Sequence, residues 1–370
     1  MRVVVAALCA LAVNAVVPAD KVTTIPGFSN PAGGSAPLSD LYSGYVNAGS
    51  GKYHHYVYSA SLNQPTTDPV VLWSNGGPGC SSLEGAFSES GLYHIQEYSS
   101  PVTVGINPFS WNNVSNNLFF ESPAGVGFSY CQTNAGCDHT DTSTAKDNLA
   151  AVISFFAAYP ELAGNDFWIA GESYAGIYIP MLAYNIFQYN KNASNPINLK
   201  GILVGNGCIG NAAGHCGTDS TNDYHDIQQW KGHGLISETL YDDIMNVCVW
   251  GNENIECTVL LTLASLSIAD IDTYYLYNTC SDPAVPLRAP LGNNSLLGRA
   301  RASSRKAAPH NGLSLDPNCF GSGPTLETYF NQPEVKAAFN VNPNIDWQLC
   351  SGNFSFVYNS DMSGLYLEGH

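Results

Sequence analysis

Gly171-Glu172-Ser173-Tyr174-Ala175-Gly176 is the stretch of this sequence that decides the fold. It is close to the Gly-x-Ser-x-Gly pattern of a nucleophile elbow, with Ala-Gly following the Ser-Tyr pair. The preceding residues 166–170 read as a buried strand, and residues 177–187 read as a helix. A strand, a sharp turn and a helix are the context in which such a serine becomes a nucleophile. We therefore expect Ser173 to stand at the top of a sheet, at a helix N-terminus that favours developing negative charge.

A second glycine-rich block follows an earlier apolar strand. Residues 73–82 read Trp-Ser-Asn-Gly-Gly-Pro-Gly-Cys-Ser-Ser, directly after Pro69-Val70-Val71-Leu72. Consecutive glycines at this place supply bare backbone N–H groups for an oxyanion hole. The alternative is a simple Gly/Pro turn between strand and helix. We favour the oxyanion hole because a turn does not require so long a block.

These two blocks, together with Glu121-Ser122-Pro123-Ala124-Gly125-Val126-Gly127-Phe128-Ser129-Tyr130, resemble the serine carboxypeptidase family of α/β hydrolases. The resemblance runs from about residue 20 to the last residue. It implies an α/β-hydrolase fold: a mixed, mainly parallel sheet flanked by helices, with a helical, disulfide-rich lid insertion. Shorter matches are Pro26-Gly27, Ser43-Gly44-Tyr45-Val46, Trp111 and Trp347-Gln348-Leu349-Cys350-Ser351.

The resemblance assigns roles to individual residues. It implies that Ser173 is the acylated nucleophile and that the backbone N–H groups of Gly77 and Tyr174 form the oxyanion hole. It implies a serine-type carboxypeptidase that releases C-terminal amino acids from peptides or proteins through an acyl-enzyme, with no cofactor and no metal. The positions that match the family's site for the substrate's α-carboxylate are Asn75, Gly76, Glu172 and Glu89.

A carboxyl group beside a substrate carboxylate predicts an acidic pH optimum. Burial and a neighbouring like charge both raise the pKa of a carboxyl group. When protonated, Glu172 can donate a hydrogen bond to the substrate carboxylate, whereas the ionised form repels it. The alternative is that Glu172 is a solvated carboxylate near a helix start, where the dipole favours it.

The aspartate and histidine that would complete a serine triad are not found in this sequence. The family's Gly-Asp and Gly-His segments and its last core strands are missing. Asp361 and His370 have the right order, but they lie too close together to come from different loops. The other histidines read as solvent-facing or locally bonded. We expect a fragment of an active enzyme; the alternative is a short protein with a broken triad, and without a base Ser173 is a weak nucleophile.

Two further functions are compatible with the sequence. The same scaffold can carry an acyltransferase, which would also use Ser173. The chain can also be a non-catalytic, carboxypeptidase-like binding protein. The retained residues for carboxylate recognition, Asn75 and Glu172, favour the peptidase.

Composition limits the partners and the compartment. The formal net charge is −17, from 30 acidic and 13 basic residues, which argues against binding nucleic acid or anionic membranes. Residues 1–19 read as a signal peptide, with Arg2 before an apolar run and a small-residue cleavage site at Ala19. We expect no membrane span after cleavage, and a location in the secretory pathway that ends outside the cell, in a vacuole or in a lysosome. A homodimer is possible.

The eleven cysteines suit such a compartment. The resemblance suggests a Cys80–Cys319 disulfide and a free thiol at Cys350. Local bridges Cys131–Cys137 and Cys208–Cys216 are plausible, and so is Cys248–Cys280, with Cys257 left open. Asn-x-Ser sequons make candidate glycosylation sites of Asn113, Asn192, Asn293 and Asn353.

The predicted organisation has four parts. Residues 1–19 are the signal, 20–207 the hydrolase core, 208–320 the lid insertion with a possible processing loop at 288–306, and 321–370 an incomplete return to the core. Strands are expected at about 43–49, 53–60, 69–74, 116–121, 165–171 and 199–205, the early ones antiparallel. Helices are expected at 142–157, 174–189, 236–248 and 325–339.

Overall fold

The structure is a computed structural model. It describes residues 17–96, 99, 101–133, 137–208, 221–268, 276, 323–351 and 355–357. The predicted signal segment up to residue 16, the processing loop 288–306 and the candidate substitutes Asp361 and His370 lie outside them.

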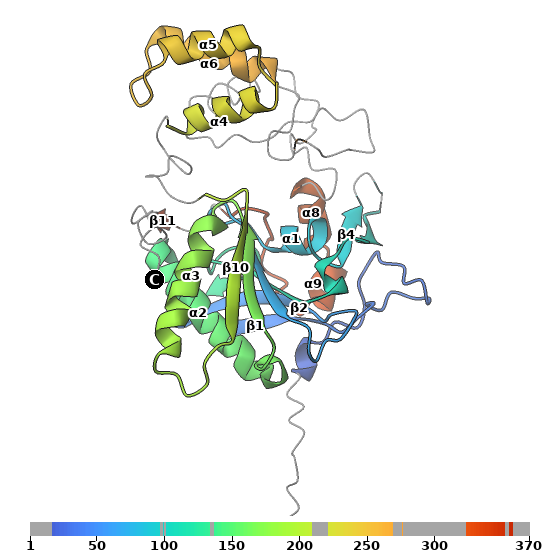
Figure 1. Cartoon of the computed structure of the whole chain (residues 1–370). Coiled ribbons are helices and arrows are strands. Elements are labelled where there is room, and N and C mark those ends of the chain that lie inside the picture. Colours follow the sequence, from blue (N-terminus) through green and yellow to red (C-terminus); the bar gives the residue numbers. More distant parts are fainter. Residues whose placement is uncertain are drawn as a thin grey trace, which may run out of the picture.

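A seven-stranded sheet forms the centre of the molecule (Figure 1). Its order is β1-β2-β6-β3-β9-β10, and β7 pairs with β2. The strands are β1 (Leu41–Asn47), β2 (Lys52–Ser59), β3 (Val70–Ser74), β6 (Asn116–Phe120), β7 (Tyr130–Cys131), β9 (Phe167–Glu172) and β10 (Leu199–Gly205). Strands β6, β3, β9 and β10 run parallel, whereas β1, β2 and β7 are antiparallel to their neighbours. The expected mixed, mainly parallel sheet with an antiparallel entry is confirmed.

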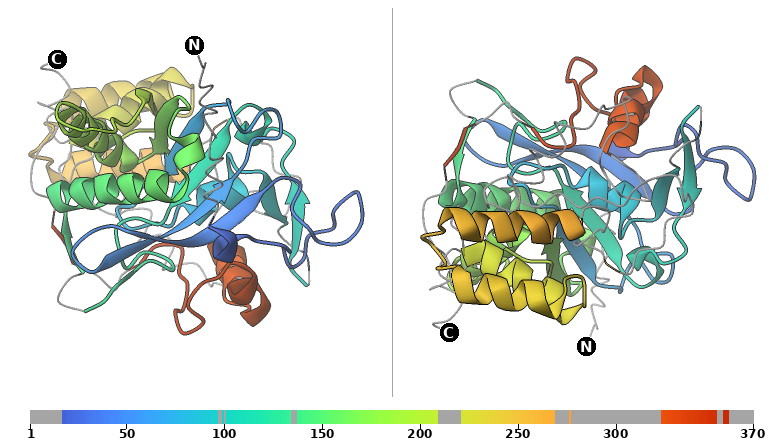
Figure 2. Two further views of the ribbon diagram at one scale, coloured as in Figure 1. Left: turned by 90° about the horizontal axis from the view of Figure 1, so that it is seen from below. Right: turned by 90° about the horizontal axis from the view of Figure 1, so that it is seen from above.

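Two long helices cover one face of the sheet (Figure 2). They are α2 (Asp141–Ala158) and α3 (Ala175–Asn190). Helix α2 begins where Thr140 and Ser143 form a reciprocal capping box. A buried apolar cluster under these helices joins Phe155 and Ile179 to the strand residues Tyr56, Leu118 and Ile169. This cluster holds α3, and therefore the turn that precedes it, firmly against the sheet.

Shorter elements cover the opposite face. They are α1 (Leu83–Ser88), the hairpin β4 (Tyr93–Gln96) and β5 (Thr103–Ile106), and the late helices α8 (Gly323–Phe330) and α9 (Pro333–Ala338). Phe87, Phe330 and Trp347 pack in a second buried cluster with Phe119 and Phe128. The helix expected at 325–339 is thus two helices, because Pro333 starts a new one.

Three helices form a third buried cluster of their own. They are α4 (Thr221–Gly232), α5 (Glu238–Val247) and α6 (Ile255–Ser267), which surround Trp230 and Leu261. They fall within the range 208–320 expected for the lid, and Figure 1 draws them together. A final short pair joins β8 (Asp138–Thr140) to β11 (Ser355–Val357) in parallel. No helix of the described segments is long and apolar enough to cross a membrane.

The edge strand β10 is more exposed than the other strands of the sheet. Its burial pattern contains no buried residue, although its sequence is apolar. Ile202, Leu203 and Val204 are 42%, 46% and 39% exposed. Within the described part of the chain, β10 pairs on one side only, with β9.

The disulfides correct two of the predicted pairings. Cys131–Cys137 is present as expected. Cys80, however, pairs with Cys350 and not with Cys319, so the prediction of a free Cys350 is also wrong. The reason is a short antiparallel bridge: Ser81 N donates to Leu349 O, and Ser351 N to Gly79 O, which brings the two cysteine Cα atoms to 3.9 Å.

The remaining cysteine predictions have mixed outcomes. Cys248 pairs with Cys257, nine residues away, and not with Cys280. The reason is local, because Cys248 follows α5 and Cys257 lies in the first turn of α6. Cys216, Cys280 and Cys319 lie outside the described residues.

Candidate active site

Ser173 occupies a sharp turn between β9 and α3. Its backbone φ is +57°, in the left-handed region that non-glycine residues seldom adopt. Two backbone bonds hold the turn: Ser173 N donates to Gly205 O at 3.2 Å, and Cys208 N donates to Ser173 O at 2.8 Å. The segment that follows β10 therefore supports the elbow from one side. Ser173 itself is half-buried.

The glycine-rich segment of residues 75–81, the glycine cradle, lies directly against this turn. A Cβ atom added to Gly76 would lie 2.4 Å from the backbone nitrogen of Tyr174 and 2.7 Å from Ser173 Cβ. Only a residue without a side chain permits this approach. The structure thus brings together the two blocks that the sequence singled out, from the ends of the adjacent parallel strands β3 and β9.

The second glycine of the cradle, Gly77, has a different constraint. Its φ is +111°, and an added Cβ would lie 2.6 Å from Gly79 N and 2.8 Å from Cys80 N. The conformation therefore requires glycine at this position. Gly77 is exposed.

The residue after the nucleophile is fixed by its own side chain. The Tyr174 hydroxyl donates to Asp141 Oδ1 at 2.7 Å, and both residues are buried. Asp141 is the first residue of α2, so this contact ties the start of α3 to the start of α2. The N–H of Tyr174 is thereby held on a rigid support.

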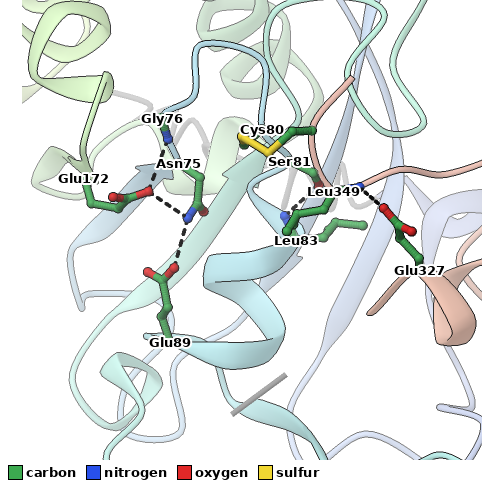
Figure 3. Close-up of a disulfide and its surroundings, with 10 residues drawn as sticks. Asn75, Gly76, Cys80, Ser81, Leu83, Glu89, Glu172, Glu327 and Leu349 are labelled. Atoms are coloured by element: carbon green, nitrogen blue, oxygen red, sulfur yellow. Dashed lines mark hydrogen bonds between the residues drawn. A yellow bond between two sulfur atoms is a disulfide. The ribbon is translucent and has the colours of Figure 1, made fainter. Parts of the chain in front are cut away.

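Asn75 is the centre of a cluster with two carboxyl groups (Figure 3). Its Oδ1 accepts hydrogen bonds from Trp73 Nε1 at 2.9 Å and from Gly85 N at 3.1 Å. These donors fix the orientation of the amide, so that Nδ2 faces the carboxyl groups. Nδ2 donates to Glu89 Oε1 at 2.9 Å and to Glu172 Oε1 at 3.3 Å.

The same oxygen of Glu172 also faces the cradle, because Gly76 N donates to it at 3.3 Å. All four residues predicted to bind a substrate carboxylate therefore meet at one place. Burial by the surrounding protein is the largest cause that raises the pKa of Glu89, to about 8, and the charge of Glu172 adds to it, whereas the hydrogen bond from Asn75 opposes it. Glu89 as a whole residue is exposed, although its carboxyl group lies against Asn75, so water screens part of the repulsion between the two acids.

The far end of the cradle is held by a segment that the sequence did not connect to it. Besides the disulfide to Cys350, Ser81 N donates to Leu349 O at 2.7 Å. Leu349 N in turn donates to Glu327 Oε1 of α8 at 3.1 Å, as Figure 3 shows. The signal for this contact was the Trp347–Ser351 match, but its position in space could not be read from the sequence.

The histidines of the core are not solvent-facing. His54 is fully buried, and neither of its ring nitrogens has a hydrogen-bond partner, so the expectation of a solvated or bonded side chain is wrong for it. His55 is also buried, but it bonds to Glu121 and Ser43. His139 lies 2.8 Å from Ala124 O through Nε2.

One group of side chains has the spacing of a metal site. The ligand atoms of Cys131, Cys137 and His139 lie within 4.8 Å of one another. The two sulfur atoms are joined in a disulfide, so they are not thiolate ligands here.

The predicted glycosylation sites divide into two groups. Asn113 and Asn192 are exposed. Asn293 and Asn353 lie outside the described residues.

Comparison with known proteins gives consistent matches. A family model described as serine carboxypeptidase matches residues 29–367. Serine carboxypeptidase ctsa-4.1 of Caenorhabditis elegans is 34% identical over 347 residues, covering 90% of this chain and 68% of that protein. Serine carboxypeptidase-like 25 of Arabidopsis thaliana is 35% identical and covers 90% and 69%. The lysosomal protective protein of Mus musculus is 33% identical and covers 94% and 72%.

A solved structure shares the fold. The prohormone-processing carboxypeptidase Kex1(delta)p from Saccharomyces cerevisiae superposes with a TM-score of 0.57 at 21% identity, covering 85% of this chain and 67% of that one. At this level of identity the likeness concerns the arrangement of the sheet and its helices.

Proposed function

The chain belongs to the serine carboxypeptidase family of hydrolases, and we propose that Ser173 is the nucleophile with which it cleaves the last peptide bond of a substrate. The observation that carries this proposal is the contact between the cradle and the elbow. Gly76 lies against Tyr174 N and Ser173 Cβ, so the hydroxyl and the candidate oxyanion donors come from touching segments.

The chemistry would proceed by acyl transfer. The Ser173 hydroxyl attacks the carbonyl carbon, and the oxygen takes up negative charge that the N–H groups of Gly77 and Tyr174 stabilise. The leaving amine is the C-terminal amino acid, and water then releases the acyl group from Ser173. A general base must accept the Ser173 proton, and we assign no residue of the described segments to that role. Loss of one oxyanion donor typically costs about 2.7–4 kcal/mol of transition-state stabilisation.

Selectivity for the chain terminus would come from the cluster around Asn75. Asn75 Nδ2 and Gly76 N are donors that a substrate carboxylate can use, but in the structure both donate to Glu172 Oε1. The substrate must therefore displace this oxygen or meet it in the protonated form. Protonation of Glu172 and Glu89 converts two repelling groups into hydrogen-bond donors, so we propose that binding is strongest at acidic pH.

The compartment and the remaining roles are proposals that rest on sequence and relatives. One relative is named as lysosomal, and the disulfides of the structure form in oxidising compartments. We propose entry into the secretory pathway after removal of residues 1–19, and glycosylation at Asn113, Asn192, Asn293 and Asn353. We also propose that residues 208–320 form a lid over a core of 20–207 and 321–370.

Labelling with a fluorophosphonate tests the proposed nucleophile. The wild-type chain is expected to be labelled at Ser173, and Ser173→Ala to remain unlabelled under the same conditions. Peptide mapping by mass spectrometry locates the modified residue. Labelling of another serine, or equal labelling of both proteins, would contradict the assignment.

Binding of a blocked amino acid such as N-acetyl-leucine tests the second half of the site independently of chemistry. Calorimetry at pH 5 is expected to show binding to the wild type and a loss of at least tenfold in affinity for Asn75→Ala. The amide N-acetyl-leucinamide, which lacks the carboxylate, serves as the control ligand. Equal affinities for the acid and the amide would rule out carboxylate recognition at Asn75.

A further inference from the structure

A buried carboxylate, Glu121, lies outside the residues assigned to the reaction. It follows β6 directly and is completely buried. Its own backbone is fixed on both sides: Glu121 N donates to His55 O at 3.0 Å, and Ser129 Oγ donates to Glu121 O at 2.6 Å. Gly127 packs so closely against the carboxyl group that no side chain fits there.

Four donors converge on this carboxylate. Oε1 accepts from Ser81 Oγ and, at 2.7 Å, from Trp347 Nε1. Oε2 accepts from Phe128 N at 2.8 Å and lies 2.8 Å from His55 Nδ1. A carboxylate offers about four acceptor sites, so all of them are in use. A buried carboxyl group is tolerated when it is satisfied in this way.

The hydrogen-bond partners of His55 indicate where the hydrogens of the Glu121–His55 pair lie. The single hydrogen of Ser43 Oγ goes to Phe339 O at 2.6 Å. The contact of 2.8 Å between Ser43 Oγ and His55 Nε2 therefore needs a hydrogen on Nε2. With that hydrogen on Nε2, another hydrogen must lie between His55 Nδ1 and Glu121 Oε2, because these two atoms would otherwise face each other as two acceptors. The pair is thus neutral overall, which permits its complete burial.

One of the four donors belongs to the candidate oxyanion loop, residues 75–81. Ser81 is the last residue of this loop, and its hydroxyl also accepts from Leu83 N at 3.1 Å at the start of α1. Cys80 N donates to Gly76 O at 3.1 Å, so a displacement of Ser81 is passed to the glycines. The other end of the loop is fixed by β3 and by the bonds of Asn75.

We propose that Glu121 is a positioning residue, which holds residues 75–81 in the geometry of an oxyanion hole through its hydrogen bond with Ser81. This inference rests on the proposed role of Gly77 as a donor, but Glu121 itself does not touch substrate. It explains why an acid occupies this position: the amide of a glutamine cannot accept from all four donors.

Two variants test the hydrogen bond between Glu121 and Ser81, one by removing it alone and one by disturbing several bonds of Glu121. Ser81→Ala removes the connection to the loop and leaves the other three bonds of Glu121 in place. Glu121→Gln places hydrogens opposite at least one donor. Asn112→Ala is the matched control, because Asn112 is equally buried and its amide nitrogen donates to Ser59 and Ala60 at the end of β2, and not to Glu121 or Ser81.

The readout is amide hydrogen exchange of the peptide that contains residues 75–81, together with the rate of fluorophosphonate labelling. Both test variants are expected to raise exchange in this peptide about tenfold and to slow labelling about 10- to 100-fold, since small misplacements of reacting groups carry costs of this size. The control is expected to lower the unfolding midpoint without changing either quantity.

The outcomes separate this inference from the proposed function. Unchanged exchange in the loop for Ser81→Ala would overturn the role of Glu121, whatever its effect on global stability. The same holds if Asn112→Ala changes the loop as strongly as the test variants. Failure of the wild type to label would show that Ser173 is not activated in this chain, while the exchange measurement would still decide the role of Glu121.

Discussion

The side-chain amide of Asn75 donates a hydrogen bond to Glu89 across 2.9 Å, with a second carboxyl group sharing the same nitrogen. One neutral donor thus serves two acids that repel each other when ionised. The balance among these groups decides how the site responds to pH. The same balance makes the stability of the fold depend on pH, which can be measured without any substrate.

Stability should fall as the pH rises through the range in which Glu89 titrates. The pKa of this carboxyl group is raised from 4.5 to about 8, mainly by burial. Between these values the folded protein keeps a proton that the unfolded chain has lost, so the free energy of unfolding decreases with increasing pH. Urea unfolding between pH 4.5 and 8 is expected to show this slope, and Glu89→Gln to reduce it. Glu256→Gln on α6 is the control, and an equal slope in Glu89→Gln and the wild type would contradict the prediction.

His54 should produce the opposite slope at lower pH. Burial, with smaller contributions from the charges of His139 and Lys52, lowers its pKa from 6.5 to about 3. As the pH falls from 6.5 towards 3, His54 is protonated in the unfolded chain but stays neutral in the folded protein. The free energy of unfolding therefore decreases. His54→Leu is expected to be more stable than the wild type at pH 4.5 by urea unfolding, because it removes an unsatisfied buried group.

The control for His54 is His233→Gln, at an exposed position after α4. It should leave the acid slope unchanged. If His54→Leu retains the full loss of stability on acidification, another group is responsible for it.

Gly76→Ala should disrupt the site without removing any functional atom. The added methyl group meets the backbone nitrogen of Tyr174 at 2.4 Å, so the loop or the elbow must move. A displacement near 1 Å can cost about 100-fold in rate, and we expect a loss of this order in fluorophosphonate labelling of Ser173. Gly164→Ala, where an added Cβ meets nothing within 4 Å, is the matched control. Labelling of both variants at the wild-type rate would show that the close contact is unimportant.

The Cys80–Cys350 bridge should contribute substantially to stability. It joins residues 270 positions apart, and removal of a native disulfide typically costs about 2–5 kcal/mol. We expect Cys80→Ser and Cys350→Ser to lower the free energy of unfolding equally, and the double variant to cost no more than either. Cys319→Ser tests the alternative Cys80–Cys319 pairing, which the family resemblance suggested. If it matches Cys80→Ser and Cys350→Ser does not, the pairing seen in the structure is wrong.

The sequence predicted the parts of the fold that are set by local patterns. The strand expected at 199–205 coincides with β10, and the helix expected at 174–189 differs from α3 by one residue at each end. These segments are apolar runs bounded by glycine or polar residues, and such signals are read within a few residues. The close approach of Ser173 to the glycine block was likewise expected, because both blocks carry unusual residues at fixed spacing.

What the sequence could not supply were contacts between distant segments. The pairing of Cys80 depends on where residues 349–351 return to the cradle, and the convergence on Glu121 draws donors from four parts of the chain. His54 was misjudged for a similar reason, since the burial of a strand residue depends on which helix covers its face. The hairpin of β4 and β5 was missed because its short strands are broken by polar and small residues.

The apolar border of β10 has a practical consequence for anyone who prepares this protein. Among the described residues this strand exposes Ile202, Leu203 and Val204 to water and pairs on one side only, so its other edge offers a template for a strand of another molecule. Concentrated samples should therefore self-associate and precipitate. Leu203→Lys would be the simplest remedy, because a charged side chain on an edge strand opposes edge-to-edge pairing between molecules.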